Sequence, residues 1–408
     1  MERPCAKTTS RCLCAAGILW FALRPQAFCI PSSGGVRRRA GPFVRCEHGH
    51  SCSRAPDPAF SATTDLEVAS GVPHRPHTAP WKHKAVIIPG FATDASAFEK
   101  LCYRLNRRGI ASVVVPIRWY HWLPTLGGRS VRPILDRIHE TVVRCVAAKS
   151  NAEMPYAFNQ PGLQSKVSPY TLGDFMCEMN DPTRGAHHEG PLELPELPSP
   201  RTDGEKVLII AHSAAGWMTR IYLSDAHYDG RMYNASGLTK GLVTLGTPHV
   251  RTWEDDGSRR EVPFARNFMF VEDHCTGEVG GGWESHVPTT CVGGSTLHGH
   301  ILWGLKDMVY TSYELCCGDG SGVGDGITPL ESAFAMQGAR RYINLEGVYH
   351  SEGFGGPWYG SDSIIDQWLE PALEGVAAVA DPMGDPAGDP VGDCVGDRAG
   401  PGSDVGEL

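Results

Sequence analysis

Apolar and polar positions alternate in blocks along the middle of the chain. Short apolar runs are followed by longer segments in which apolar side chains recur every three or four positions. The runs predict buried strands at 84–91, 111–117, 207–211, 241–245 and 342–345. The periodic segments predict helices at 95–108, 131–148, from the third strand to about 225, and 363–376. This alternation favours an α/β domain with a mostly parallel sheet covered by helices on both faces.

Two segments interrupt the alternation. Residues 150–204 are rich in Pro, Glu, Asp and His and predict a surface insertion. Residues 250–302 are expected to form a cap-like insertion over the sheet. Four apolar residues in that insertion are expected either to line a pocket or contact lipid, or to seal the cap against the body: Phe264, Phe268, Met269 and Phe270. The aromatic stretch at 117–123 leaves the same two alternatives open, and the rim of such a pocket is the preferred one.

Composition separates both ends of the chain from this domain. The first 50 residues carry eight Lys and Arg against two acids, and their apolar stretch at 12–23 is too short to span a membrane. An apolar run followed by a basic, acid-poor segment resembles a two-part plastid targeting sequence, with a plain chloroplast transit peptide or a secretory signal as alternatives. We therefore expect a targeting peptide and linker at 1–80 and the folded domain at 81–380. The Gly/Asp repeat that follows predicts a disordered tail at 381–408.

Charge and cysteine content exclude some functions. The chain has a net charge of −9, and the part after the basic N-terminus is strongly acidic, without a basic stripe for nucleic acid. The 14 cysteines include no CxxC pairs at zinc spacing. We therefore expect neither a metal site nor a cofactor. A single disulfide between Cys275 and Cys291 is left open.

Ser213 lies where the strand at 207–211 turns directly into a helix. A residue on such a turn projects at the carboxyl edge of the sheet, with the N-terminus of the helix beneath it. The tight approach of strand and helix demands small side chains on either side, and these positions hold Ala211 and Ala215. Ser213 is therefore a candidate nucleophile. The alternative is a serine that only caps the helix.

A nucleophilic serine needs a base and an acid that orients the base. His350 is the preferred base, because it follows the late strand at 342–345 and precedes the last helix. His249 also follows a strand, but it precedes every plausible acid. Asp325, in a Gly-rich loop 25 residues before His350, is the preferred acid, and Asp319 is the alternative. Both aspartates are also compatible with plain turn residues.

Two backbone N–H groups are candidate donors to a developing oxyanion. The N–H of Ala214 follows the nucleophile directly, and the N–H of Phe91 lies in the turn after the first strand. The turn glycine before Phe91 is equally consistent with an ordinary turn.

Five segments in consistent order carry a resemblance to a known family. IIPGF, IIAHSAAGW, GLVTLGTPH, GDGITPLESA and GVYHS followed by PWYGS resemble the plant and algal α/β-hydrolase proteins related to lipases and to GPI inositol-deacylase-like esterases. The resemblance spans about residues 84–373, without 150–204. It implies the α/β-hydrolase fold, with Ser213, Asp325 and His350 as the catalytic triad. Alanine replaces the family's usual glycine at position 211 and again at position 215.

The function expected from these residues is hydrolysis of carboxylic esters, lipid-like or acyl, through an acyl-enzyme. The partners would be an ester or lipid substrate and, through apolar cap residues, the surface of a membrane. A catalytically weak hydrolase-fold protein that binds a ligand or a membrane is the alternative, and the altered turn around Ser213 favours it.

Overall fold

The structure, a computed structural model, describes residues 83–126, 130–150, 153–154, 205–249, 265–275 and 282–380. The targeting and tail segments expected at 1–80 and 381–408 lie outside the described residues. So does the expected insertion at 150–204, apart from three residues near its start. Among the described helices, none has both the length and the apolar composition needed to cross a membrane.

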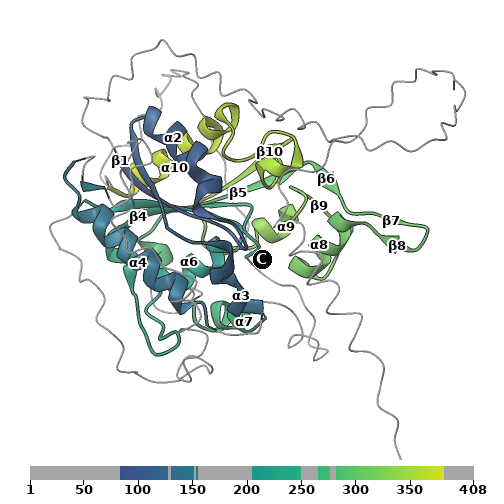
Figure 1. Cartoon of the computed structure of the whole chain (residues 1–408), viewed down its shortest axis with the longest axis horizontal. Coiled ribbons are helices and arrows are strands. Elements are labelled where there is room, and N and C mark those ends of the chain that lie inside the picture. Colours follow the sequence, from purple (N-terminus) through teal and green to yellow (C-terminus); the bar gives the residue numbers. More distant parts are fainter. Residues whose placement is uncertain are drawn as a thin grey trace, which may run out of the picture.

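A six-stranded parallel sheet forms the centre of the molecule (Figure 1). The strand order is β10-β5-β4-β3-β1-β2, and every neighbouring pair runs parallel. The strands are β1 His83–Ile88, β2 Ile110–Val114, β3 Val207–His212, β4 Thr239–Leu245, β5 Thr289–Ser295 and β10 Arg341–Glu346. The predicted α/β class with a mostly parallel sheet is therefore confirmed.

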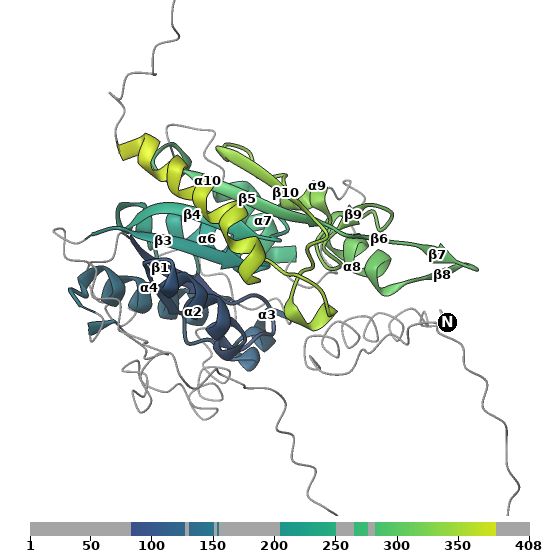
Figure 2. The ribbon, with the colours of Figure 1, turned by 90° about the horizontal axis from the view of Figure 1, so that it is seen from above.

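Helices cover both faces of this sheet (Figure 2). Apolar side chains of α2 and α10 pack on one face, and those of α4, α6 and α7 pack on the other. The helices are α2 Glu99–Arg107, α3 Leu123–Leu126, α4 Arg132–Ala147, α6 Ala215–Leu223, α7 Ala265–His274, α8 Met308–Cys317, α9 Leu330–Ala333 and α10 Asp362–Ala380. Two short antiparallel pairs lie apart from the sheet: β6 Leu297–His298 with β9 Val323–Gly324, and β7 Ile301–Leu302 with β8 Leu305–Lys306.

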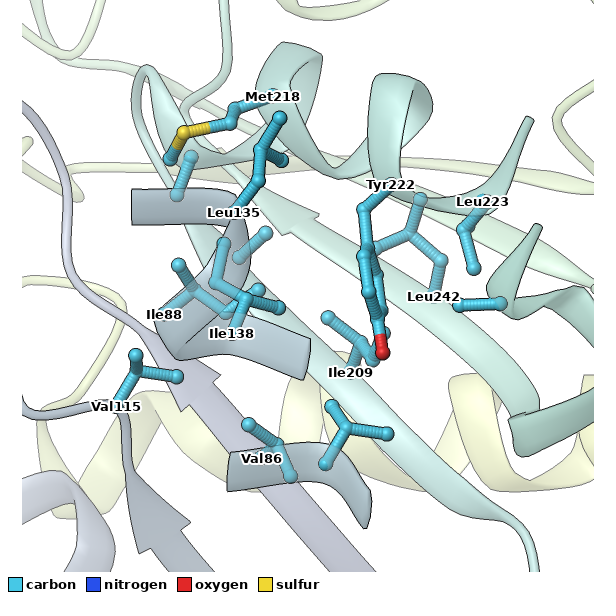
Figure 3. Packing of buried hydrophobic residues seen from close by; sticks show 14 of the residues in the cluster. Val86, Ile88, Val115, Leu135, Ile138, Ile209, Met218, Tyr222, Leu223 and Leu242 are labelled. Atoms are coloured by element: carbon cyan, nitrogen blue, oxygen red, sulfur yellow. The ribbon is translucent and has the colours of Figure 1, made fainter. Parts of the chain in front are cut away.

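Strand β1 illustrates why a strand that is buried on both faces is apolar throughout. Successive side chains of a strand point to opposite faces. Val86 and Ile88 accordingly join the core under α4 and α6 (Figure 3). Ala85 and Ile87 join the core under α2 and α10. Each fully buried aliphatic side chain of this kind contributes about 1.5–3 kcal/mol to folding.

The expectation of an insertion over the whole of 250–302 is wrong at its C-terminal end. Residues 289–295 form β5, an interior strand of the sheet between β4 and β10. Its sequence, TTCVGGS, has no apolar run, because two glycines replace side chains where neighbours approach closely. A Cβ on Gly293 would lie 2.6 Å from Leu330, and one on Gly294 would lie 2.3 Å from the Val348 carbonyl.

Two of the expected cap residues seal α7 against the body. The ring of Phe268 is buried against Trp217, with the ring centroids 5.3 Å apart. Phe270 packs edge-to-face on the buried Tyr228. Phe264 lies outside the described residues. In the stretch 117–123, which was expected at a pocket rim, Trp122 is fully buried in the core.

The order of the strands leaves a topological switch point between β1 and β3. From β1 the chain first moves to β2 on one side, and it then adds β3, β4, β5 and β10 on the other. In open α/β sheets, ligands usually bind outside the carboxyl ends of the strands at such a switch point. The turns after these two strands hold Phe91 and Ser213.

Candidate active site

Ser213 occupies a strained turn between β3 and α6. Its φ angle is +53°, a left-handed backbone conformation that residues other than glycine rarely adopt. The Ser213 N–H donates to the Leu245 carbonyl at 2.9 Å, which ties the turn to the end of β4. Strain of this kind concentrates at functional sites, and a cap serine does not require it.

Small residues around the turn are required, but the tightest contacts lie at glycines. A Cβ on Gly216 would lie 2.1 Å from the Thr247 hydroxyl, and one on Gly90 would lie 2.8 Å from the Ser213 Cβ. Ala211 and Ala215 are fully buried, as expected. Gly90 is therefore more than an ordinary turn residue, because it allows the loop after β1 to approach the serine.

His350 and Asp325 form a buried pair. The His350 Nδ1 lies 2.7 Å from the Asp325 Oδ2, and the His350 N–H donates to the Asp325 carbonyl at 3.0 Å. Both side chains are buried, the carboxylate completely. The structure thus joins the predicted base to the preferred acid, in the arrangement that holds a catalytic imidazole in one tautomer.

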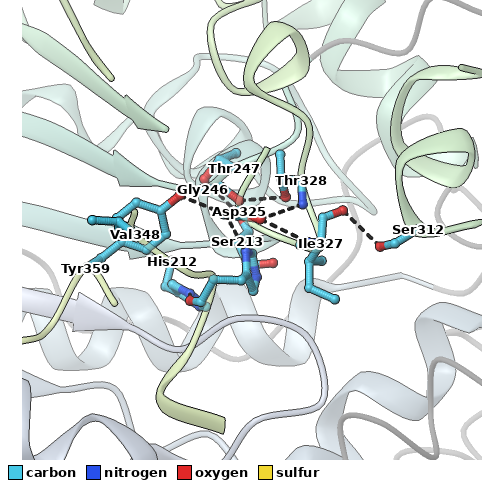
Figure 4. Close-up of polar contacts among 12 residues, drawn as sticks. His212, Ser213, Gly246, Thr247, Ser312, Asp325, Ile327, Thr328, Val348 and Tyr359 are labelled. Atoms are coloured by element: carbon cyan, nitrogen blue, oxygen red, sulfur yellow. Dashed lines mark hydrogen bonds and ion pairs between the residues drawn. The ribbon is translucent and has the colours of Figure 1, made fainter. Parts of the chain in front are cut away.

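The Asp325 carboxylate is held by three further donors. Its Oδ1 accepts the N–H groups of Ile327 at 3.0 Å and Thr328 at 2.8 Å, and its Oδ2 accepts the Tyr359 hydroxyl at 2.7 Å (Figure 4). Burial acts to raise the pKa of Asp325, but the charge and hydrogen bond of His350 and the two backbone donors outweigh burial, so the pKa is lowered. The carboxylate is therefore ionised at neutral pH.

Tyr359 is a site residue that sequence reasoning missed. Burial and the neighbouring Asp325 carboxylate raise its pKa well above the ordinary value, so the phenol keeps the proton that it donates. Tyr359 lies within PWYGS, one of the segments that carry the family resemblance. The resemblance therefore singled out the segment that contains Tyr359, but it did not indicate that the tyrosine binds the Asp325 carboxylate.

The turn after β4 connects the serine to the acid. The Thr247 hydroxyl donates to the Ser213 carbonyl at 2.8 Å, and the Thr328 hydroxyl donates to the Gly246 carbonyl at 2.9 Å. Gly246 has a φ of +57°, and a Cβ there would lie 2.4 Å from the Asp325 Oδ2. Residues from three separate loops therefore meet at one edge of the sheet (Figure 4).

His212 links the loop that carries His350 to the turn that carries Ser213. Its Nε2 lies 2.9 Å from the His350 carbonyl, and the two rings are 4.6 Å apart. The His212 ring is buried, with Phe98 packed edge-to-face against it. Within the described residues the Ser213 hydroxyl itself makes no hydrogen bond, and catalytic bonds are often long in ligand-free enzymes.

The alternative candidates have other partners. His249 is buried in the core, where its Nε2 lies 3.1 Å from the Thr244 hydroxyl. Asp319 is exposed, and its carboxylate accepts the N–H and the hydroxyl of Ser321 at 2.8–2.9 Å. Asp319 is thus a turn residue. Cys275 and Cys291 are both free thiols, so the disulfide left open is not formed.

The two expected oxyanion donors flank Ser213. Ala214 precedes the first residue of α6, and the first N–H groups of a helix have no acceptor within it. Phe91 follows Gly90 in a turn that Thr93 closes by donating its hydroxyl to the Gly90 carbonyl at 2.7 Å. The Phe91 ring packs edge-to-face on Trp122, which anchors this turn to the core. Both donor assignments stay predictions.

Because two histidine side chains are buried in the neutral form, we predict that the free energy of unfolding decreases as the pH falls. Burial, with the nearby His350, lowers the pKa of His212 from 6.5 to about 3, and burial beside Arg220 lowers that of His249 well below 6.5. Below pH 6.5 the unfolded chain binds protons that the folded chain excludes. Each histidine therefore removes about 1.4 kcal/mol of stability per pH unit as the pH falls from 6.5.

Urea unfolding between pH 7 and pH 5 measures this dependence. The variant His249→Gln should reduce the slope by about 1 kcal/mol per pH unit averaged over this range, because the unfolded histidine is only partly protonated near pH 6.5. The variant His286→Gln, which alters an exposed ring, is the matched control. An unchanged slope for His249→Gln would show that this ring is not held neutral by the fold.

Comparison with known proteins assigns no family. No protein-family model matches the sequence, and no match to it is found among curated proteins. The function must therefore be inferred from the geometry of the site.

Proposed function

We propose that the protein is a serine hydrolase of the α/β-hydrolase fold that cleaves carboxylic esters. One observation carries the proposal: a buried His350–Asp325 pair, joined at 2.7 Å, adjoins a left-handed serine at a strand-to-helix turn. This combination serves nucleophilic acyl transfer. We also propose that the chain is related to the family that it resembles, and that its N-terminal segment is a plastid targeting sequence.

The proposed reaction has two steps. The His350 Nε2 accepts the Ser213 proton while the serine oxygen bonds to the ester carbonyl carbon, and Asp325 stabilises the imidazolium. The alcohol then leaves with the proton from His350, and a water molecule hydrolyses the acyl-enzyme by the same route. The Ala214 and Phe91 amides are assigned to the oxyanion, where the loss of one donor typically lowers the rate about 10²- to 10³-fold.

Covalent labelling with a fluorescent fluorophosphonate tests this function. The wild-type chain should be labelled, because the probe reacts only with an activated serine. Ser213→Ala should not be labelled, and Ser236→Ala, which alters a half-buried serine in the short 3₁₀ helix before β4, should react as the wild type does. Unlabelled wild-type protein is then assayed against esters of graded acyl length to define the substrate, because the probe blocks the serine that it labels.

The labelling experiment also decides between the enzyme and a catalytically weak binding protein. The alanines at 211 and 215 favour the weak protein, since they narrow the turn relative to glycine. A wild-type chain that resists the probe, or a Ser213→Ala variant labelled at the wild-type rate, would refute the proposed nucleophile.

A further inference from the structure

A hairpin of exposed apolar residues projects from the body of the molecule. It consists of β7 and β8 with a two-residue turn, and both views show it extending away from the sheet (Figures 1 and 2). Five apolar residues in or next to it are more than half exposed: Ile301 51%, Leu302 63%, Trp303 100%, Leu305 75% and Met308 52%. Contiguous exposed apolar residues on a soluble domain mark an interaction site.

The backbone of the two turn residues is strained, and the side chain of the first, Trp303, makes no packing contact that would offset the strain. Trp303 and Gly304 both have positive φ angles, +55° and +77°. Two-residue hairpin turns of this kind favour Asn-Gly, and a bulky residue at the first position is an outlier. Since the Trp303 side chain is fully exposed, contacts with the body do not explain its presence. An unexplained strained residue points to a function.

The chemistry of the tip fits a lipid bilayer. Ile301 and Leu302 point to opposite faces of the ribbon and both are exposed, so a partner must surround the tip rather than cover one side. Residues 301–305 contain no charged side chain. The ammonium group of the next residue, Lys306, pairs with the Glu314 carboxylate at 2.6 Å. Charge is costly in hydrocarbon, and tryptophan concentrates at membrane interfaces.

We infer that the tip at 301–305 inserts into the interface of a bilayer and docks the protein there. The base of the projection adjoins the candidate site. The β9 strand ends at Gly324, directly before Asp325, and the Tyr313 hydroxyl donates to the Leu297 carbonyl and accepts the Gly326 N–H. Docking therefore brings the catalytic edge of the sheet to lipid. That this edge then acts on bilayer esters rests on the proposed function.

Flotation of the full chain with phosphatidylcholine vesicles tests the docking. The informative variant is Trp303→Asn, since asparagine tolerates the left-handed turn better than tryptophan. Its thermal midpoint should equal or exceed that of the wild type, while its vesicle binding should fall about tenfold or more. Met232→Ser, which alters a half-exposed apolar residue outside the hairpin, should bind as the wild type does.

Three outcomes would overturn the docking: no vesicle binding by the wild type, equal binding by Trp303→Asn, or a dimer in sedimentation that only Trp303→Asn abolishes. The last would identify a second copy of the chain as the partner. Ser213→Ala should bind vesicles like the wild type. A wild-type chain that binds vesicles but hydrolyses no ester would refute the enzyme and keep the docking. A wild-type chain that hydrolyses esters but binds no vesicles would refute the docking and keep the enzyme.

Discussion

Replacing Asp325 with asparagine is expected to lower kcat for ester hydrolysis about 10⁴-fold while leaving the fold intact. The carboxylate accepts the His350 Nδ1–H and the Tyr359 hydroxyl on the same oxygen, Oδ2. In the asparagine variant, the position of Oδ2 is taken either by the amide NH₂, which donates instead of accepting, or by the amide oxygen, which accepts but carries no charge. Neither stabilises the imidazolium that forms when His350 takes the serine proton.

Steady-state hydrolysis of a soluble ester measures this effect, with circular dichroism to verify folding. Asp319→Asn is the matched control, because it alters an exposed aspartate of the same Gly-rich segment that bonds only within its own turn. Tyr359→Phe, which removes one of the two donors to Oδ2, should give a smaller loss. Equal rates for Asp325→Asn and Asp319→Asn would exclude Asp325 from catalysis.

Replacing Asp229 with asparagine is expected to destabilise the protein by about 3–5 kcal/mol, because it leaves a buried charge without its counterion. The Arg132 Nε lies 3.5 Å from the Asp229 Oδ2, and the two side chains are 1% and 0% exposed. Arg132 also donates to the Asp229 carbonyl at 2.9 Å. Asparagine accepts the left-handed φ of +49° at this position, so the loss reflects the charge and not the backbone.

Urea unfolding gives the change in free energy. Asp366→Asn is the control: it pairs with Arg108 at 2.6 Å, but the carboxylate is 53% exposed, so solvent screening should keep its effect below about 1 kcal/mol. Combining Asp229→Asn with Arg132→Met should recover most of the loss, since no buried charge remains. A loss for Asp229→Asn no larger than that for Asp366→Asn would contradict the argument.

The helices α2, α4, α6 and α10 and most central strands could be predicted because their signals are local. The apolar run of β3 and the periodic apolar positions of α4 each reflect burial within a few residues of the chain. Strand β5 could not be predicted in this way. Its Gly293 and Gly294 are required by α9 and by the loop before His350, which lie 35 or more residues further along the chain.

By itself, the sequence determined that a small-residue turn places a serine between β3 and α6, and it ranked His350 and Asp325 first, because turn geometry and strand order are local or sequential properties. Only the tertiary structure decided which of 17 histidines meets which carboxylate, and that Tyr359, Thr328 and Gly246 hold the pair in place. These contacts join loops from β4, β5 and β10, and spacing along a chain does not encode the distances between loops that the packed sheet brings together.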